Sequence, residues 1–320
     1  MNVSIVIPTY IRNDDLNQCL DSILIQTLLP GEVIIVDNSP GHTPEALIHL
    51  RKIEFEGIGI KLYYLHNSQN SLTSARNLGS KQITGDIVLF LDDDVILDVE
   101  YVREICRVYE TNPNAFGVQG YIQPENRGKL DCFHRIFFWF HLERNKCRVL
   151  HSVSATYPLD LDDVIPCEWL SGANHSYRRK ILDEFEYDEV LLKYSEGEDL
   201  EYSYRVYCQY PGSLFITPNA KLVHKTSPAG RMLGRELVYM QEVYGLYLFF
   251  KLFEPNLKNM LTYFWSRIGR LVISLARAVI KRPAGAISEL KYRFGAYILC
   301  LRCADEIRRG DLTFFNNTLS

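Results

Sequence analysis

The chain has 320 residues, 47% of them apolar and 12% aromatic, which is enough to bury a core in one large domain or in two. Its formal net charge of −4 is small, and no nucleic-acid partner is expected. Charge is unevenly placed: residues 1–224 carry 20 Lys and Arg against 32 Asp and Glu, whereas residues 225–320 carry 15 against 7. The basic C-terminal third indicates either contact with an anionic membrane surface or ligand, or ordinary charged decoration of surface helices.

In chain order, the N-terminal part alternates strands with helices. The apolar periodicity predicts a strand at 3–7, a helix at 14–27, strands at 32–39 and 60–66, a helix at 71–83, a strand at 86–94, a helix at 99–111 and a strand at 115–122. Such alternation is typical of βαβ units in a mostly parallel sheet flanked by helices, an α/β fold with a Rossmann-like core. The strands are continuous apolar runs, as expected when both faces of the sheet are covered.

After residue 122 this rhythm changes. The pattern predicts an aromatic helix at 131–144, a loop at 151–166, a small-residue turn followed by a helix at 167–182, a helix with an acidic start at 195–209, and a hairpin or edge strand at 212–227.

The C-terminal third contains one amphipathic segment, residues 259–282. Its arginines lie near one face (Arg267, Arg270, Arg277) and its apolar residues form the opposite stripe (Leu261, Phe264, Ile268, Leu271, Leu275, Val279). The arginines interrupt the run of roughly 18 uncharged residues that a spanning helix needs. The segment therefore predicts a helix lying on a membrane or on the protein's own core. Under the first alternative the helix and its arginines would attach the protein peripherally to the inner face of the plasma membrane.

The compartment is predicted from the cysteines and from the first residues. Eight cysteines without a framework spacing indicate reduced thiols and a cytoplasmic location. The opening stretch MNVSIVIPTY begins a strand and lacks the charged and long apolar regions of a signal peptide.

Polar residues stand at the C-terminal ends of three predicted strands: Pro8-Thr9-Tyr10, Asp37-Asn38 and Asp92-Asp93-Asp94. In a parallel sheet these ends meet at one edge, where ligands bind. The chain has neither GxxxxGK[ST] nor GxGxxG, so phosphate-loop and dinucleotide sites are not predicted. Carboxylates that hold Mg²⁺ or Mn²⁺ remain a way to neutralise a nucleoside diphosphate. Asp92 and Asp94 would point to one side of an extended segment and could share the ion.

The segments SIVIPTY, VIIVDNS, ARNLG, FLDDD, WLSGANHSYRR, GEDLEYSYR and LVHK, in this order, resemble the family 2 glycosyltransferases, which are inverting enzymes of the GT-A fold. The resemblance covers residues 1–227 and implies a GT-A domain there, with a nucleotide-binding half at 1–122 and an acceptor-binding half at 123–227. Residues 228–320 would form a helical C-terminal extension, for which association with a membrane is one of the two alternatives given above.

The resemblance also implies roles for single residues. Pro8, Thr9 and Tyr10 would line the nucleotide pocket, Asp37 would bind the uracil edge of a UDP donor, and Arg76 would approach the base or the phosphates. Asp92 and Asp93 would bind the nucleotide-sugar. Asp94, Asp92 and His224 would be the metal ligands. The residues that would border the donor sugar and the acceptor are Trp169, Gly172, Ala173 and Asn174. Asp199 would be the catalytic base, with Glu198 beside it and Glu196 as a nearby rival.

The activity implied is inverting transfer of a sugar from a nucleotide-diphosphate sugar, UDP first, to a hydroxyl of a glycan or lipid-linked acceptor in cell-surface polysaccharide or glycoconjugate synthesis. Inversion needs one base for the acceptor proton and charge stabilisation on the departing diphosphate. Two alternatives stay open. A sugar nucleotidyltransferase would usually have a Gly-rich basic loop where this chain has PTYIRNDD, and in a non-catalytic nucleotide-sugar binder Asp199 would be dispensable.

Overall fold

The structure is a computed structural model that describes residues 1–41, 45–122, 137–138, 146–276, 278–279 and 285–319. The chain divides into two compact units, the first of Met1–Pro124 with Leu159–Arg231 and the second of Glu125–Pro158 with Met232–Ser320. The helix predicted at 131–144 falls almost wholly outside the described residues. The functional division into a nucleotide-binding half, an acceptor-binding half and an extension from residue 228 stays a prediction.

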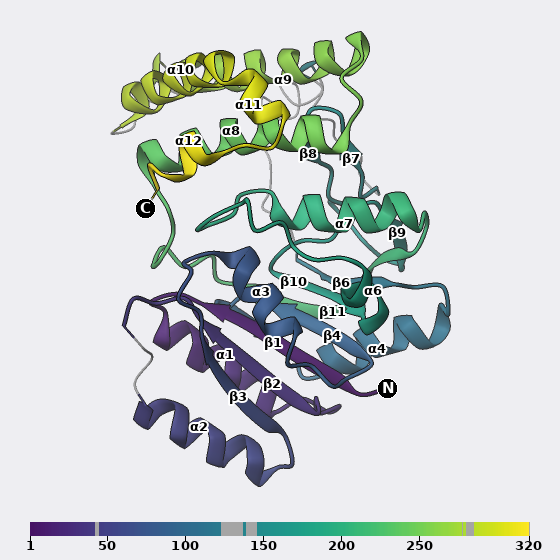
Figure 1. Cartoon of the computed structure of the whole chain (residues 1–320). Helices are drawn as coiled ribbons and strands as arrows, with labels where there is room; N and C mark the ends of the chain where they lie inside the picture. Colours follow the sequence, from purple (N-terminus) through teal and green to yellow (C-terminus); the bar gives the residue numbers. More distant parts are fainter. Residues whose placement is uncertain (42–44, 123–136, 139–145, 277, 280–284, 320) are drawn as a thin grey trace. The chain divides into compact units, whose positions relative to one another are not determined.

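The first unit is an α/β sandwich built on one mixed sheet (Figure 1). Its strands are β1 (Val3–Thr9), β2 (Glu32–Asp37), β3 (Lys61–His66), β4 (Ile87–Leu91), β5 (Val95–Leu97), β6 (Gly117–Tyr121), β9 (Ile165–Cys167), β10 (Asn174–Arg178) and β11 (Leu214–His224). Its helices are α1 (Asn13–Leu24), α2 (Glu45–Gly57), α3 (Leu72–Ser80), α4 (Tyr101–Thr111), α6 (Arg179–Glu184) and α7 (Glu198–Gln209).

The strand order is β3-β2-β1-β4-β10-β6-β11-β5, with β9 paired to β11. Strands β3, β2, β1 and β4 are parallel, as are β6 and β11, whereas β10 runs antiparallel between β4 and β6. The register pairs Thr9 with Asp37 and Val6 with Phe90. The C-terminal ends of β1, β2 and β4 therefore lie together, as the sequence predicts for a mostly parallel sheet.

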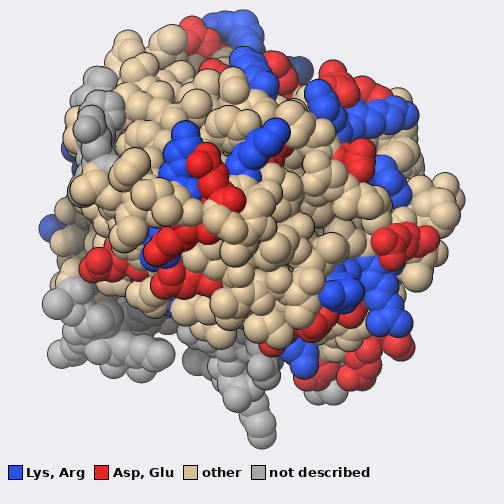
Figure 2. Space-filling view, turned by 90° about the horizontal axis from the view of Figure 1, so that it is seen from below, with Lys and Arg blue, Asp and Glu red and all other residues tan. Residues whose placement is uncertain are grey.

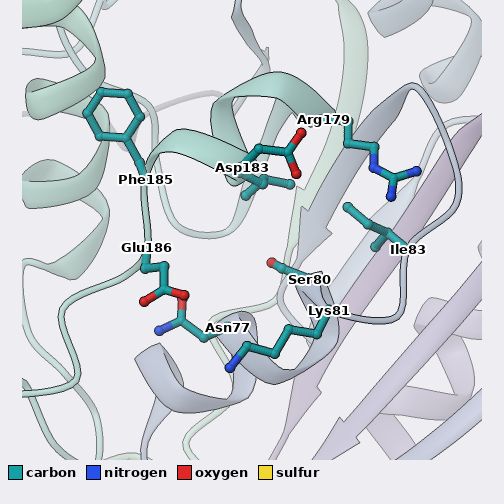
Figure 3. A pocket seen from close by; sticks show the side chains of 9 residues that line it. Asn77, Ser80, Lys81, Ile83, Arg179, Asp183, Phe185 and Glu186 are labelled. Atoms are coloured by element: carbon teal, nitrogen blue, oxygen red, sulfur yellow. The ribbon is translucent and has the colours of Figure 1, made fainter.

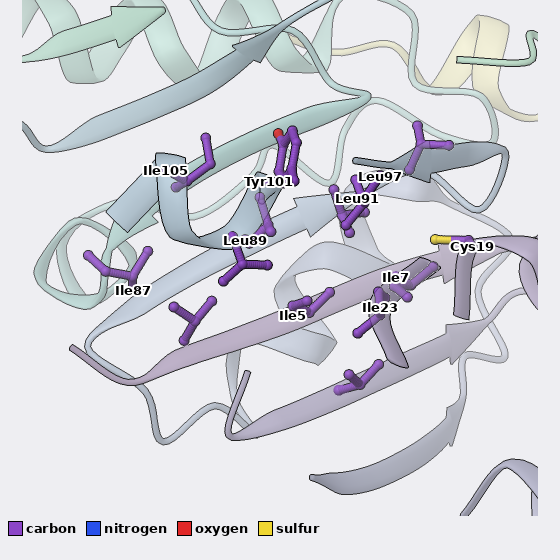
Figure 4. Close-up of a cluster of buried hydrophobic side chains, with 14 of the residues drawn as sticks. Ile5, Ile7, Cys19, Ile23, Ile87, Leu89, Leu91, Leu97, Tyr101 and Ile105 are labelled. Atoms are coloured by element: carbon purple, nitrogen blue, oxygen red, sulfur yellow. The ribbon is translucent and has the colours of Figure 1, made fainter. Parts of the chain in front are cut away.

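The core of this unit lies on both faces of the central strands. Figure 4 shows Ile5 and Ile7 of β1 and Leu89 of β4 gathered with Ile23 of α1 and Ile105 of α4. The opposite face carries Val6 and Val36 against α3. A Cβ at Gly79 would lie 2.4 Å from Val6 Cγ1, so only a glycine lets α3 approach this closely.

Two sequence predictions need correction here, and one helix was not predicted. Residues 174–178 form strand β10 inside the segment predicted as a turn followed by a helix, and the helix α6 begins only at Arg179. The predicted hairpin or edge strand at 212–227 is a single strand, β11, which pairs with β6, β5 and β9. Helix α2 was not predicted because its apolar Leu50 and Ile53 are exposed and give no buried stripe.

The second unit is helical. It contains α8 (Gly234–Leu252), α9 (Leu257–Ala276), α10 (Ala286–Arg302), α11 (Ala304–Arg308), α12 (Thr313–Asn316) and an antiparallel pair of short strands, β7 (Val149–Leu150) and β8 (Ser154–Ala155). Helix α8 packs against α10 and α11, and α10 packs against α9 (Figure 1). Over the described residues, no helix combines the length and apolar character needed to cross a bilayer.

Surface charge is mixed where it can be followed. On the face shown in Figure 2, acidic and basic side chains lie in small neighbouring groups with uncharged areas between them.

Candidate active site

The three aspartates follow β4 and point in different directions. Asp93 is 3% exposed, accepts a hydrogen bond from Thr9 Oγ1 at 2.7 Å and pairs with Arg12 at 2.9 Å. Asp92 and Asp94 instead offer oxygens to a common point with His224, and one ligand atom from each lies within 4.8 Å of the others. Asp93 thus faces away from its two neighbours, as expected, but the segment is the turn between β4 and β5 and not the extended segment that the sequence predicts.

His224 reaches this point because β11 pairs with β5. The antiparallel register sets His224 opposite Val95, the residue after Asp94. His224 Nε2 lies 3.1 Å from Asp94 Oδ1 and 4.0 Å from Asp92 Oδ2. Burial disfavours the imidazolium, but the carboxylates of Asp94 and Asp92 outweigh it and raise the pKa of His224. Burial alone would likewise raise the pKa of Asp94, yet His224, Arg12 and the backbone N–H of Ser227 together lower it.

The cluster has the chemistry of a divalent-cation site. Asp94 Oδ1 and His224 Nε2 are both buried, and neither makes a hydrogen bond of good geometry within the described residues, although they lie close together. Buried polar atoms without such a bond are uncommon, and a bound ion is one arrangement that would satisfy both atoms. Two carboxylates and one imidazole fit a divalent ion such as Mn²⁺. Asp94, Asp92 and His224 could therefore hold the ion.

Two arginines that sequence reasoning missed border the cluster. Arg12, just after β1, donates to Asp93 and to the carbonyls of Ala229 and Ser227, and so ties down the segment after β11. Arg231 Nη2 lies 3.8 Å from Asp94 Oδ2, and its side chain is 30% exposed. Arg12 could have been found from PTYIRNDD, which follows a strand ending at the same edge as Asp92. Arg231 had no comparable signal, because it reaches the site through the turn after β11.

Arg76 lies beneath the site and is 1% exposed. Its guanidinium pairs with Glu198, donates to the Gly172 carbonyl at 2.9 Å and lies 3.6 Å from Asp92 Oδ1. Burial raises the pKa of Glu198, and Arg76 opposes that rise. Direct contact of Arg76 with a nucleotide stays a prediction, and its partners in the structure are protein groups.

Asp199 differs from Glu198 in being only partly buried. Both residues begin α7, directly after Gly197, whose φ of 85° turns the chain into the helix. Asp199 Oδ2 accepts a hydrogen bond from the Gly172 backbone N–H at 2.8 Å, and Oδ1 accepts one from Leu200 N. A Cβ at Gly172 would lie 3.1 Å from Glu198 Oε1 and 3.3 Å from Asp199 Oδ2, so glycine allows this close approach.

The remaining predicted residues surround this group to different extents. Asn174 is fully buried in β10 and donates to the Gly120 carbonyl, and the Ala173 carbonyl accepts from Asp92 N. Trp169 is partly buried. Asp37 is fully buried at the end of β2, where it accepts hydrogen bonds from Tyr64 Oη at 2.7 Å and from Ser39 N.

Pro8 and Thr9, at the end of β1, are buried, and Tyr10, directly after the strand, is partly exposed. Their roles toward a nucleotide stay predictions, as do those of Asp37, Trp169 and Asn174.

A separate pocket of about 200 Å³ lies between the end of α3 and α6 (Figure 3). Lys81, Arg179 and Asp183 are among its lining residues. Arg178, just before α6, pairs with Ile87 at the start of β4, whereas Asp92 follows the end of that strand. The pocket is therefore at the opposite edge of the sheet from the aspartate cluster and is not part of the candidate active site.

The parallel strands ending at a carboxylate–imidazole cluster, with a buried ion pair and an acidic helix start beside it, match the GT-A class of glycosyltransferase. Solved structures share this fold. Residues 1–349 of S. aureus TarS, solved with UDP, superpose with a TM-score of 0.53 at 15% identity, over 99% of this chain and 92% of that one. The mannosyltransferase PcManGT from Pyrobaculum calidifontis, solved with GDP-Man and Mn²⁺, gives 0.57 at 14% identity, over 94% and 87%.

Sequence comparison names the family. The model of glycosyl transferase family 2 matches residues 4–184, and the chain belongs to that family. It is 25% identical over 236 residues to the glucosyl-dolichyl phosphate glucuronosyltransferase of Haloferax volcanii, over 70% of this chain and 69% of that protein. It is 32% identical over 111 residues to the uncharacterized glycosyltransferase YwdF of Bacillus subtilis, over 35% of this chain but only 39% of YwdF. The predicted family and fold class are confirmed.

Proposed function

We propose that the protein is a metal-dependent, inverting glycosyltransferase that moves a sugar from a UDP-sugar to a hydroxyl of a glycan or lipid-linked acceptor. The observation that carries this proposal is the cluster of Asp92, Asp94 and His224, in which two buried ligand atoms lack hydrogen bonds of good geometry. The nucleotides and Mn²⁺ in the solved neighbours support a nucleotide-sugar donor and a divalent ion. The Haloferax volcanii relative, with dolichyl phosphate in its name, supports a lipid-linked acceptor.

In this proposal each part of the site has one task. A divalent ion held by Asp94, His224 and Asp92 would neutralise charge on the diphosphate leaving group. Arg231, partly exposed beside Asp94, would add a positive charge at the same place. Asp199 would take the proton of the acceptor hydroxyl, since its carboxylate is partly exposed and its orientation is fixed by the Gly172 N–H. Glu198 is buried against Arg76 and would position the start of α7 instead of reacting.

Donor binding is tested first. Thermal unfolding of the wild type and of Asp94→Ala is followed with UDP, GDP, dTDP or CMP, each with and without Mn²⁺. A ligand that binds the folded protein raises the melting temperature. We expect a rise with UDP that depends on Mn²⁺ and disappears in Asp94→Ala. The absence of any rise in folded wild-type protein would contradict the metal site.

Turnover is tested next, with Asp199→Asn and UDP-sugar hydrolysis as the readout. Because a general base contributes roughly 10²–10⁴-fold, Asp199→Asn should lose at least about 100-fold in rate while it keeps the thermal shift with UDP. Binding without turnover in the wild type would support the non-catalytic binder instead. The acceptor, the pathway and the cytoplasmic location stay predictions.

A further inference from the structure

Helix α9 is amphipathic, but its polar side faces the interior. Asn259, Tyr263, Ser266, Arg267 and Ser274 are buried. The apolar residues that recur at spacings of three and four on the other side are between 42% and 75% exposed: Leu257, Leu261, Phe264, Ile268, Val272 and Leu275. A helix on the surface of a water-soluble domain normally has the reverse arrangement. The stripe from Leu257 to Leu275 is about 27 Å long at 1.5 Å per residue.

Helix α10 also exposes an apolar stripe. Its Ile287, Phe294, Ile298 and Leu301 are exposed, while Arg293 is buried together with the small residues Ala286, Ala296 and Cys300. These four residues and the six on α9 are here called the outer apolar face. Single exposed apolar side chains are ordinary, but two packed helices with matching exposed stripes mark an interaction surface.

A buried carboxylate fixes this orientation. Glu242 of α8 is 1% exposed and pairs with Arg293, with Arg267 at 3.3 Å and with Arg270 at 3.9 Å. Burial alone would raise the pKa of Glu242, but the three arginines outweigh it and lower that pKa. Arg267 also donates to the Ser152 carbonyl at 2.7 Å. If α9 rotated to bury its apolar stripe, the buried Glu242 carboxylate would lose the arginines of α9 as counter-charges, which is strongly unfavourable. The prediction that these arginines meet a membrane is therefore wrong for Arg267, which is buried.

We propose that the outer apolar face binds the headgroup–acyl boundary of an anionic lipid bilayer. Exposed cations accompany the face: Lys258 stands beside Leu257, Lys291 lies between Ile287 and Phe294, and Arg302 follows Leu301. The only carboxylate within α9 and α10, both fully described, is Glu289, which is engaged by Arg293 and Ser274. An apolar surface bordered by cations complements anionic lipid. In a pairing of two copies through this face, like charges would meet.

The test is co-sedimentation of the full-length chain with vesicles of phosphatidylcholine alone or with added phosphatidylglycerol. We expect at least tenfold stronger binding to the anionic vesicles. The double variant Ile268→Asp/Leu275→Asp should lose at least tenfold in binding, because both side chains are already solvent-exposed and the variant should fold. Ile53→Asp on α2, where the side chain is 57% exposed, is the matched control and should bind as the wild type does.

Two results would overturn the proposal. One is equal binding of the wild type and the double variant to anionic vesicles, or no binding by either. The other is a dimer of the wild type in lipid-free sedimentation velocity that the double variant abolishes, without vesicle binding, since that would assign the face to a second copy. The UDP thermal shift, measured on the same samples, reports the state of the donor site separately. The proposal therefore does not depend on the proposed activity.

Discussion

Arg76 is the residue on which the geometry of the predicted catalytic region depends most. It is 1% exposed, pairs with a Glu198 that is itself 5% exposed, and donates to the Gly172 carbonyl. In Arg76→Met, the Glu198 carboxylate would stay buried without its counter-charge. Breaking a buried pair in this way costs about 3–5 kcal/mol. The partly buried Gly172 carbonyl would also lose its donor, which adds about 1 kcal/mol, so a loss of about 4–6 kcal/mol is expected.

The assay is urea unfolding followed by circular dichroism at about pH 9, because burial raises the pKa of Glu198 to about 8 and the carboxylate is ionised in the wild type only above that pH. A second variant, Arg76→Met/Glu198→Gln, removes the stranded charge and should recover about 2 kcal/mol or more relative to Arg76→Met alone. The matched control is Lys52→Met, in which an exposed pair with Glu56 at 3.8 Å is lost and the change should stay within about 0.5 kcal/mol. A cost below about 1 kcal/mol for Arg76→Met, or additive single effects in the double variant, would refute the reasoning from the buried pair.

Three further perturbations test other parts of the structure. Gly172→Ala should lower kcat about tenfold with little change in melting temperature, because the new Cβ would lie 3.1 Å from Glu198 Oε1. The control is Gly41→Ala, where nothing lies within 4 Å of the new Cβ, and it should leave kcat unchanged. A metal ion binds the neutral imidazole, and the pKa of His224 is raised, so protons compete with the ion at this residue. The affinity for Mn²⁺, measured by calorimetry, should therefore fall between about pH 8 and about pH 6. In His224→Gln the affinity should depend less on pH. Burial holds the pKa of His175 well below 6.5, so below about pH 6.5 the unfolded chain takes up a proton at this residue and the folded chain does not. The free energy of unfolding should therefore fall by about 1.4 kcal/mol for each pH unit below that point, as measured by urea titration. If His175→Gln shows the same pH slope as the wild type, the prediction is contradicted.

The edge of the sheet that carries the candidate site could be predicted from the sequence. Strands β1, β2 and β4 are buried on both faces and read as continuous apolar runs, which identifies them as parallel central strands. The polar residue after each run must then lie at a common edge. The contact of Thr9 with Asp93 at 2.7 Å is the direct outcome of that rule.

Strand β10 could not be found in the same way, because its buried residues are polar. His175 lies between the Ser171 carbonyl and Tyr187 Oη, and Ser176 donates to the Val118 carbonyl. Hydrophobic periodicity detects buried apolar side chains only. It cannot detect buried polar side chains whose hydrogen-bond partners lie in distant segments of the chain. The pairing of Asn174 with Leu91, the residue before Asp92, therefore appears only once β10 is placed between β4 and β6.

Helix α9 shows the same limit in another form. The sequence shows that the helix has two faces, one with Arg267 and Arg270 and the other with Leu261 and Ile268. The periodicity does not determine which of these faces packs against the core. That choice depends on Glu242, which lies on another helix and is buried among three arginines. Because a buried charge without partners is far more costly than an exposed leucine, the arginines turn inward and the apolar residues turn outward. The outward stripe is thus a consequence of one buried carboxylate, and Glu242→Gln should weaken vesicle binding only if it also loosens the packing of α9 on α8.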